Sequence, residues 1–295
     1  MKTVPNRHIV VGDIHGEFNG LARILRQAGL IDSCQNWTGA DTILVQTGDV
    51  IDRGPRSWDC VRLLRNLQEQ ATAAGGRVIR LCGNHETMLL QNPHNSYANF
   101  TEPERLATEL RKEIRQGKVQ AGYTDGTWLF THAGLRSVIR SALLSELGTE
   151  TATLEELVTH VNGVFSKAVA DDDFTTHPIF NIDEMRDGSD DVGGIFWGDY
   201  ALLSTSLKAY DIPQIFGHTP TMKKGVQHAQ NFRLIDIDAG MYTGYGGNLL
   251  YLEIDHAGSI RQHYEEDGEW VEKPLGETRP ETYWQNQTIK ENNRR

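Results

Sequence analysis

Near the start of the chain stands the stretch His8-Ile9-Val10-Val11-Gly12-Asp13-Ile14-His15-Gly16. Its first half is an apolar run typical of a buried β-strand. Its second half brings a carboxylate and an imidazole close together between glycines, which let the backbone turn sharply beside an ion. In an open α/β sheet, ligands bind outside the carboxyl ends of the strands. The stretch therefore predicts a ligand site at the end of the first strand of such a sheet.

Four further segments with metal-ligating side chains follow along the chain, each after a short apolar run. They are Gly48-Asp49-Val50-Ile51-Asp52-Arg53-Gly54, Gly83-Asn84-His85-Glu86, His132-Ala133-Gly134 and Gly217-His218. Carboxylates, imidazoles and one carboxamide would then converge on one sheet edge, and such donors suit a pair of divalent metal ions. Most of these segments, taken alone, are explained by a capped turn, a local ion pair or a structural histidine. The segment with Asn84 and His85 is more specific, because a neutral amide is an unusual metal ligand. Together, in this order, they predict a dinuclear metal centre, a device used for in-line attack on phosphorus.

The remaining apolar periodicity indicates the fold class. Strand-like runs lie at residues 8–12, 42–46, 77–82, 127–131, 212–216, 232–237, 249–254 and 259–264. Helical patterns at 18–28 and 57–74 separate the early runs, which is the βαβ rhythm of a largely parallel sheet. The late runs predict an antiparallel meander that forms a second sheet packed against the first. We therefore expect an α/β fold in which two mixed β-sheets pack as a sandwich flanked by helices.

The length of 295 residues fits one large α/β unit. We expect a single catalytic domain over residues 1–275, with a helical insert at about 135–195 and a polar C-terminal tail at 276–295. Residues 102–116 have a helical composition, and residues 117–126 are expected to be a loop. An insert between catalytic loops carries specificity or merely covers a sheet face, and the sequence leaves both interpretations open.

The net charge and the cysteine content indicate which binding partners and which cellular compartment to expect. The net charge of −11 disfavours nucleic acid and anionic lipid as partners. Three scattered cysteines, Cys34, Cys60 and Cys82, fit a reducing compartment. The N-terminus lacks the apolar core of a signal peptide, and no apolar run reaches transmembrane length. A cytoplasmic protein without membrane or nucleic-acid partners is the expectation.

The five segments together resemble the phosphoprotein phosphatase family within the calcineurin-like metallophosphoesterases. The resemblance extends from about Arg7 to Asp255 and is strongest to the Shewanella-like phosphatases. Besides the metal segments it rests on Ala74-Gly75-Gly76, Thr87-Met88, Thr219-Pro220, Asp238-Ala239-Gly240-Met241 and Gly244-Tyr245-Gly246-Gly247. It implies the calcineurin-like fold and a phosphoric monoester hydrolase that acts on phosphorylated proteins or small phosphomonoesters.

The resemblance also implies a role for each ligand. The first metal would be held by Asp13, His15 and Asp49, and the second by Asp49, Asn84, His132 and His218, with Asp49 bridging. A water or hydroxide shared by the ions would be the nucleophile. Manganese is the first expectation for the two divalent ions, and iron, zinc, cobalt and magnesium remain alternatives.

The resemblance also implies catalytic and substrate-binding roles. Arg53 would bind two phosphate oxygens, His85 would protonate the leaving oxygen, and Asp52 would hold the imidazole of His85. Asn84 and Tyr245 are further expected substrate contacts. Related enzymes carry a second phosphate-binding arginine after a Trp-centred motif, but Trp197-Gly198-Asp199 is followed by no arginine before Gly217. Arg136 or Arg186 could replace it, and we expect Arg136 to contact substrate.

Several alternatives stay open at this stage. A diadenosine tetraphosphatase shares the metal segments, but Asp52 and Glu86 favour phosphomonoesters. A nuclease or cyclic phosphodiesterase is disfavoured, because Pro220 stands where those enzymes have a histidine. A catalytically inactive phosphoprotein-binding module is a further alternative, although all the expected ligands are present. Phosphotyrosine and phosphoserine or phosphothreonine are not distinguished.

Overall fold

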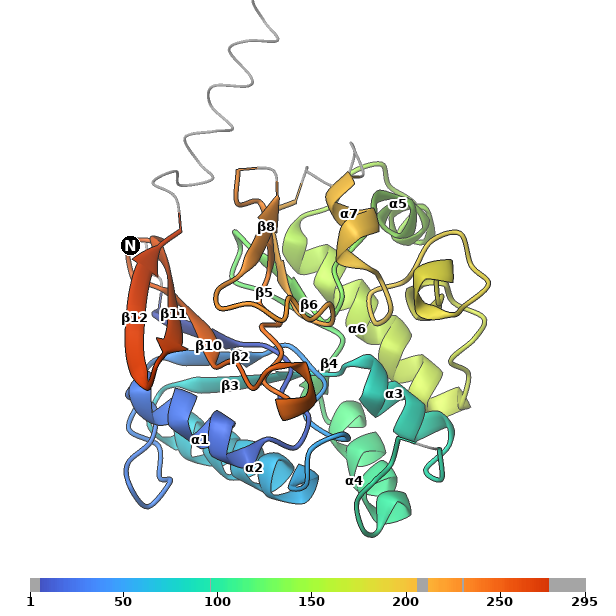
Figure 1. The fold of residues 1–295 in the computed structure, drawn as a ribbon. Helices are drawn as coiled ribbons and strands as arrows, with labels where there is room; N and C mark the ends of the chain where they lie inside the picture. Colours follow the sequence, from blue (N-terminus) through green and yellow to red (C-terminus); the bar gives the residue numbers. More distant parts are fainter. Residues whose placement is uncertain (1–5, 96, 206–211, 230, 276–295) are drawn as a thin grey trace, which may run out of the picture.

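The structure is a computed structural model that describes residues 6–95, 97–205, 212–229 and 231–275. Two β-sheets form its centre, and helices cover their outer faces (Figure 1). This confirms the expected sandwich of two mixed sheets. The predicted tail at 276–295 lies outside the described residues.

The first sheet has seven strands in the order β12-β11-β10-β1-β2-β3-β4. Its parallel half consists of β1 (His8–Val11), β2 (Ile43–Gln46), β3 (Arg77–Leu81) and β4 (Val119–Gln120). Its antiparallel half consists of β10 (Leu250–Ile254), β11 (Ile260–Glu266) and β12 (Glu269–Pro274). The two halves join where β10 pairs antiparallel with β1, with His8 opposite Ile254.

The second sheet has five strands in the order β5-β6-β7-β9-β8. The strands are β5 (Gly122–Thr124), β6 (Leu129–Thr131), β7 (Gln214–Phe216), β8 (Gln227–Ala229) and β9 (Leu234–Asp236). Pairing of β6 with β7 and of β7 with β9 is parallel, and the outer pairs are antiparallel. The carboxyl ends of β6 and β7 therefore lie together.

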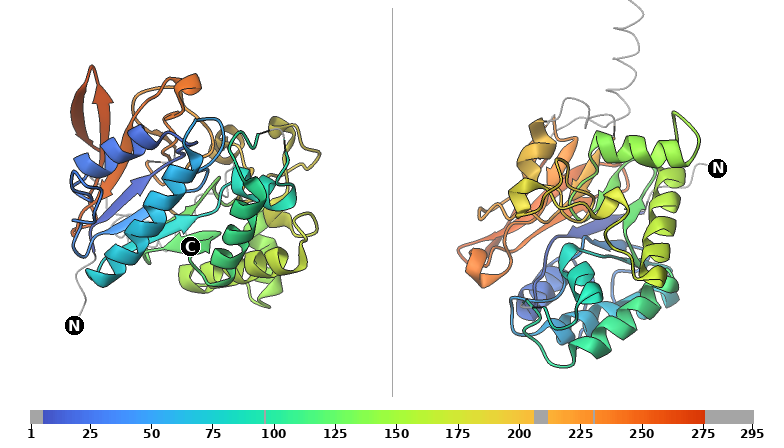
Figure 2. Two further views of the ribbon diagram at one scale, coloured as in Figure 1. Left: turned by 90° about the horizontal axis from the view of Figure 1, so that it is seen from below. Right: turned by 90° about the vertical axis from the view of Figure 1, so that its right-hand side faces the viewer.

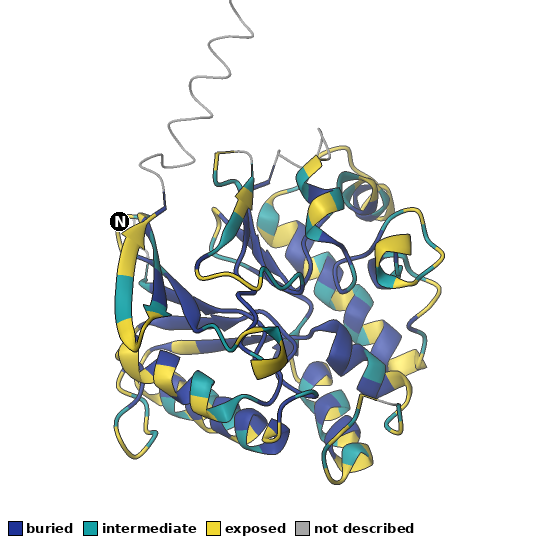
Figure 3. Cartoon of the chain, viewed as in Figure 1, coloured by how far each residue is buried: buried dark blue, intermediate teal, exposed yellow. Residues whose placement is uncertain are grey.

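Alternating side chains divide the core into layers, because successive residues of a strand point to opposite faces. Val10 and Val45 of the first sheet share a buried cluster with Phe130 and Ile215 of the second. Their neighbours on the other face of the first sheet contact α1 (Phe18–Gln27) and α2 (Ser57–Ala73). Figure 2 shows these layers from two further directions. Figure 3 shows that the central strands are buried, that β12 at the edge of the first sheet is largely exposed, and that the helices expose their outer faces.

The remaining helices lie beside the second sheet and at the sheet ends. They are α3 (Asn84–Gln91), α4 (Pro103–Arg115), α5 (Ser137–Glu146), α6 (Leu154–Asp171), α7 (Tyr200–Thr205) and the 3₁₀ turns η1 (Pro178–Phe180), η2 (Glu184–Arg186) and η4 (Thr243–Tyr245). Residues of α5 and α6 share a buried cluster with Leu129 of β6. None of the described helices combines the length and the apolar character needed to span a bilayer.

Two expectations about the fold are wrong. The late runs do not form one antiparallel meander in the second sheet. The runs at 212–216 and 232–237 contain β7 and β9, which lie in the second sheet but pair in parallel. The runs at 249–254 and 259–264 contain β10 and β11, which extend the first sheet because β10 pairs with β1. Residues 117–126 are not merely a loop, since they contain β4 and β5. These strands have only two and three residues, which is too short to show an alternating pattern.

Candidate metal centre

The five predicted segments all follow the carboxyl ends of strands. Asp13 and His15 follow β1, Asp49 follows β2, Asn84 begins α3 just after β3, and the two other histidines follow β6 and β7. All six predicted ligands are buried, with at most 7% of any residue exposed. The expected convergence of the donors is present, but the expectation of a single sheet is wrong. The candidate ligands follow strands of both sheets, and side chains from the two sheets lie within hydrogen-bond range of one another.

One group of donors lies toward the second sheet. His132 Nε2 lies 2.9 Å from Asn84 Oδ1 and 3.1 Å from His218 Nδ1. His218 Nδ1 lies 2.9 Å from the same Asn84 oxygen. His132 Nε2 is also 3.6 Å from Asp49 Oδ1. These four side chains are the set expected for the second ion.

A second group of donors lies toward β1. His15 Nε2 is 3.6 Å from Asp49 Oδ2 and 3.9 Å from Asp13 Oδ2. Asp49 thus presents one oxygen to each group, which is the arrangement a bridging carboxylate requires. His85 Nε2 lies 4.0 Å from Asp49 Oδ2, so distance alone also admits His85 to the first group.

The donor set fits two divalent cations. The Nδ1 atoms of His15 and His132 lie 3.0 Å from the carbonyls of Ile51 and Thr47, which fixes the Nδ1–H tautomers and leaves both Nε2 lone pairs facing the cluster. His132 Nε2 and Asn84 Oδ1 are both acceptors and lie only 2.9 Å apart, and Asp13 Oδ2 is buried without a hydrogen-bond partner among the described residues. Acceptors that face one another without donors are costly unless a cation lies between them.

Burial sets the ionisation of the cluster. It raises the pKa of Asp49 to about 6. It also raises the pKa of Asp13 well above the usual value, with the charges of Asp238 and Asp49 adding to the effect. Burial lowers the pKa of His132 to about 4 and that of His15 well below the usual value. Neutral imidazoles beside crowded carboxylates are the state in which a metal ion is bound most readily.

Asp52, His85 and Arg53 form a separate group beside the ligands. His85 Nδ1 lies 2.7 Å from Asp52 Oδ2, and His85 Nε2 lies 3.3 Å from Arg53 Nη2. Burial raises the pKa of Asp52 to about 7 and lowers the pKa of His85. The distance of 2.7 Å places a hydrogen bond between the imidazole of His85 and the carboxyl group of Asp52.

Two tyrosines flank the guanidinium of Arg53. Its Cζ atom lies 5.0 Å from the ring centre of Tyr245 and 5.9 Å from that of Tyr97. The Tyr97 ring also contacts His85 edge-on, with the centroids 5.4 Å apart. The sequence analysis named Tyr245 but missed Tyr97, because no motif surrounds Tyr97 in the loop after α3.

The catalytic loops have unusual backbone conformations. Five non-glycine residues of the site have positive φ, a region that only a small share of such residues adopts. They are His15 (46°), Asp49 (54°), Asp52 (68°), Arg53 (62°) and His218 (75°). Close approach is also required at Gly83, where a Cβ atom would collide with Asp49 Oδ1. Strained residues of this kind cluster at functional sites.

Glu86 holds two of these loops together, a role that the sequence analysis missed. Its Oε2 accepts hydrogen bonds from the backbone N–H groups of Asp49 (2.9 Å) and Gly83 (2.8 Å). Its Oε1 accepts from Val50 (2.9 Å) and Ile51 (3.3 Å). One buried carboxylate thus joins the loop after β2 to the loop after β3.

The two arginines considered from the sequence differ in position. Arg186 donates from Nη2 to Thr219 Oγ1, and Thr219 directly follows His218. Arg136 precedes α5 and is half-buried, with Nη1 buried and without a hydrogen-bond partner among the described residues. The substrate contact of Arg136 stays a prediction.

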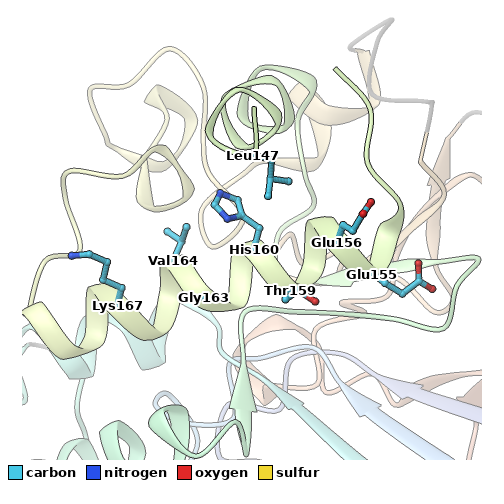
Figure 4. A pocket seen from close by; sticks show the side chains of 8 residues that line it. All are labelled: Leu147, Glu155, Glu156, Thr159, His160, Gly163, Val164 and Lys167. Atoms are coloured by element: carbon cyan, nitrogen blue, oxygen red, sulfur yellow. The ribbon is translucent and has the colours of Figure 1, made fainter. Parts of the chain in front are cut away.

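A surface hollow of about 680 Å³ lies on α6, away from these residues (Figure 4). It is lined by Leu147, Glu155, Glu156, Thr159, His160, Gly163, Val164 and Lys167. None of the predicted metal ligands or catalytic residues is among them, so this hollow is not the site of the chemistry.

Fold and site together define a metallophosphoesterase. A family model described as calcineurin-like phosphoesterase matches residues 7–222 of the chain. The chain therefore belongs to the calcineurin-like phosphoesterase family.

Several proteins that are similar in sequence or structure are named as protein phosphatases. Shewanella-like protein phosphatase 2 of Arabidopsis thaliana is 40% identical over 87 residues, which is 30% of this chain and 22% of that protein. Shewanella-like protein phosphatase 1 of Plasmodium berghei is 27% identical over 280 residues, covering 84% of this chain and 71% of that protein. The cold-active protein-tyrosine phosphatase of a psychrophilic Shewanella species superposes with a TM-score of 0.66 at 22% identity, covering 92% of this chain and 80% of that one. This last likeness supports the fold.

Proposed function

We propose that this protein is a metal-dependent phosphoprotein phosphatase that hydrolyses phosphomonoesters of tyrosine, serine or threonine. The main support is the group formed by Asp52, His85 and Arg53 beside the ligand cluster. A phosphomonoester needs a cation for its phosphate oxygens and an acid for its single leaving oxygen, and this group offers both. The relatives named as protein phosphatases support the same substrate class.

The six buried donors are proposed as the ligands of two divalent ions. They are Asp13, His15, Asp49, Asn84, His132 and His218. When bound, such ions supply positive charge and lower the pKa of a water molecule so that it attacks phosphorus. We propose manganese as the metal, because carboxylate, amide and imidazole donors without thiolate suit it.

The other residues bind the phosphate and move one proton. Arg53 binds two phosphate oxygens through its planar fork and offsets the charge that develops on them. His85 gives the proton on Nε2 to the leaving oxygen. Asp52 accepts the Nδ1–H of His85 and stabilises its protonated form. Asn84, Tyr245 and Arg136 are proposed as further substrate contacts.

The cellular location and the partners are a further part of the proposal. Cys34, Cys60 and Cys82 are unpaired thiols, which fits a cytoplasmic location. The net charge of −11 fits a protein that acts without nucleic-acid or membrane partners. We further propose that residues 1–275 act as one catalytic domain.

The test is orthophosphate release by the manganese-loaded protein. Matched phosphotyrosine and phosphothreonine peptides are compared with diadenosine tetraphosphate, each with and without a chelator. Release from a peptide that stops on chelation is the expected result. Turnover of the dinucleotide alone would assign the enzyme to nucleotide metabolism, and no turnover of any substrate by a metal-loaded, folded protein would favour an inactive binding module.

A further inference from the structure

A guanidinium from the helical insert lies beside the ligands of the second ion. Arg186 ends η2, and its Nη2 donates a hydrogen bond to Thr219 Oγ1 at 2.8 Å and forms an ion pair with Asp199 Oδ2 at 2.9 Å. Thr219 directly follows His218, and its hydroxyl also accepts the backbone N–H of Tyr200. Arg186 is therefore fixed to the loop that positions a metal ligand.

The Trp-centred segment supports the same arrangement. The Trp197 ring contacts the His218 ring edge-on, with the centroids 6.1 Å apart. Asp199, two residues further on, is 8% exposed and receives the ion pair from Arg186. The Arg186 side chain is 22% exposed, so it is held in place and is still reached by solvent.

The two arginines lie on different sides of the cluster. Arg186 contacts Thr219, the residue that directly follows His218. Arg53 Nη2 instead lies 3.3 Å from His85 Nε2. Positive charge therefore flanks the ligand cluster on the side of the second ion and on the side of the first.

Arg186 keeps donors free for a further acceptor. A guanidinium has five N–H donors, and both contacts described above use Nη2. Its Nε is buried and has no hydrogen-bond partner among the described residues. A buried N–H without an acceptor is costly, and an anion beside it would remove that cost.

We propose that Arg186 is a phosphate-binding residue of the active site. It would donate to a non-bridging oxygen of the substrate phosphate from the His218 side, while Arg53 donates from the His85 side. Asp199 and Thr219 are the residues that position it. The helical insert would thus supply part of the active site rather than only cover a sheet. This inference rests on the proposed phosphatase function.

The test measures binding of inorganic phosphate to the manganese-loaded protein by titration calorimetry, together with KM and kcat for a phosphopeptide. Arg186→Ala is expected to weaken phosphate binding about tenfold and to lower kcat/KM by about 10- to 100-fold at unchanged metal content. The control is Arg105→Ala on α4, whose side chain forms exposed ion pairs with Glu102 and Glu109 and is expected to behave as the wild type.

A second variant tests the role of Arg186 even if Arg186→Ala fails to fold. Asp199→Asn keeps Arg186 but removes its ionic anchor, and a smaller loss of phosphate affinity, about threefold to tenfold, is expected. Wild-type phosphate affinity and kcat/KM in both variants would overturn the role of Arg186. Loss in Arg136→Ala but not in Arg186→Ala would transfer the role to Arg136.

The wild-type protein separates failure of this inference from failure of the proposed function. A wild type that binds phosphate and hydrolyses phosphopeptides, with Arg186→Ala unchanged, contradicts only the role of Arg186. A metal-loaded wild type that does neither contradicts the proposed function and this role together.

Discussion

The hydrogen bond between Asp52 and His85 is the central feature at the scale of single residues. The two side chains are 2.7 Å apart and buried, so His85 is oriented before substrate arrives. Its Nε2 lies beside Arg53, where a phosphate group would also be held. The distance of 4.0 Å from His85 Nε2 to Asp49 Oδ2 leaves one competing role, that of a metal ligand.

His85→Asn distinguishes the two roles. If His85 is the acid, the variant keeps both metal ions but loses about 10²- to 10⁴-fold in kcat, because proton transfer to the leaving oxygen is lost. Metal content by mass spectrometry and kcat with a phosphopeptide are measured on the same preparation. Loss of one ion per chain would show that His85 is a ligand.

Arg53 gives a second prediction at this scale. Arg53→Ala is expected to lower kcat/KM by about 10²- to 10³-fold, because a fixed donor for the phosphate oxygens is removed. Arg53→Lys is expected to recover only part of this loss, since an ammonium lacks the planar fork. Steady-state kinetics with both variants provide the measurement, and an unchanged kcat/KM in Arg53→Ala would contradict the role.

At the scale of elements, the loops after β2 and β3 are joined by the carboxylate of Glu86. Four backbone N–H groups donate to it, including those of Asp49 and Gly83. Both loops contain proposed metal ligands, and the distance between Asp49 and Asn84 depends on this side chain. A side chain that holds ligands in position affects metal affinity although it does not touch the metal.

Glu86→Asp is expected to weaken metal binding by about 10- to 100-fold, because the shorter side chain cannot reach both loops. Glu86→Gln keeps the length but replaces one accepting oxygen by an NH₂ group, and a similar loss is expected. Equilibrium dialysis against manganese measures both variants, and circular dichroism confirms that they fold. Wild-type affinity in both would show that the loops hold their positions without Glu86.

The arrangement of the elements could be predicted from the sequence only in part. The convergence of the candidate ligands was predictable within each sheet, because each one follows an apolar strand and parallel strands bring their carboxyl ends together. That two sheets bring their edges together was not predictable from these segments. The sheet that contains β10–β12 was not predictable, since an antiparallel meander can pair with either sheet and only the β1–β10 pairing decides it. Tyr97 approaches Arg53 through a long-range contact that leaves no local pattern.

For the whole molecule, a buried ion-pair network joins the layers on the side of α4. Glu113 of α4 accepts two hydrogen bonds from Arg80 of β3, at 3.1 and 3.0 Å, and one from Arg65 of α2 at 3.0 Å. Burial alone would raise the pKa of Glu113, but these hydrogen bonds and charges outweigh it and hold the pKa below its usual value. The network therefore contributes stability only while Glu113 is ionised.

Glu113→Gln is expected to lower the free energy of unfolding by about 2–4 kcal/mol at pH 7, because Arg80 is left buried without its partner. Since the folded pKa lies below the unfolded value of about 4.3, the contribution is complete above that value and is lost as the pH falls through the folded pKa. Urea unfolding of both proteins from pH 7 to pH 3.5 measures this. A difference that stays constant down to the lowest pH would contradict the linkage.

The dinuclear centre is the central claim, and manganese stoichiometry tests it most directly. Metal-free protein is dialysed against manganese, and bound metal per chain is compared for the wild type and Asp49→Asn. Two ions per chain in the wild type and a large loss in Asp49→Asn are predicted, because Asp49 presents one oxygen to each donor group. One ion or none in folded wild-type protein, or two ions in Asp49→Asn, would contradict the account.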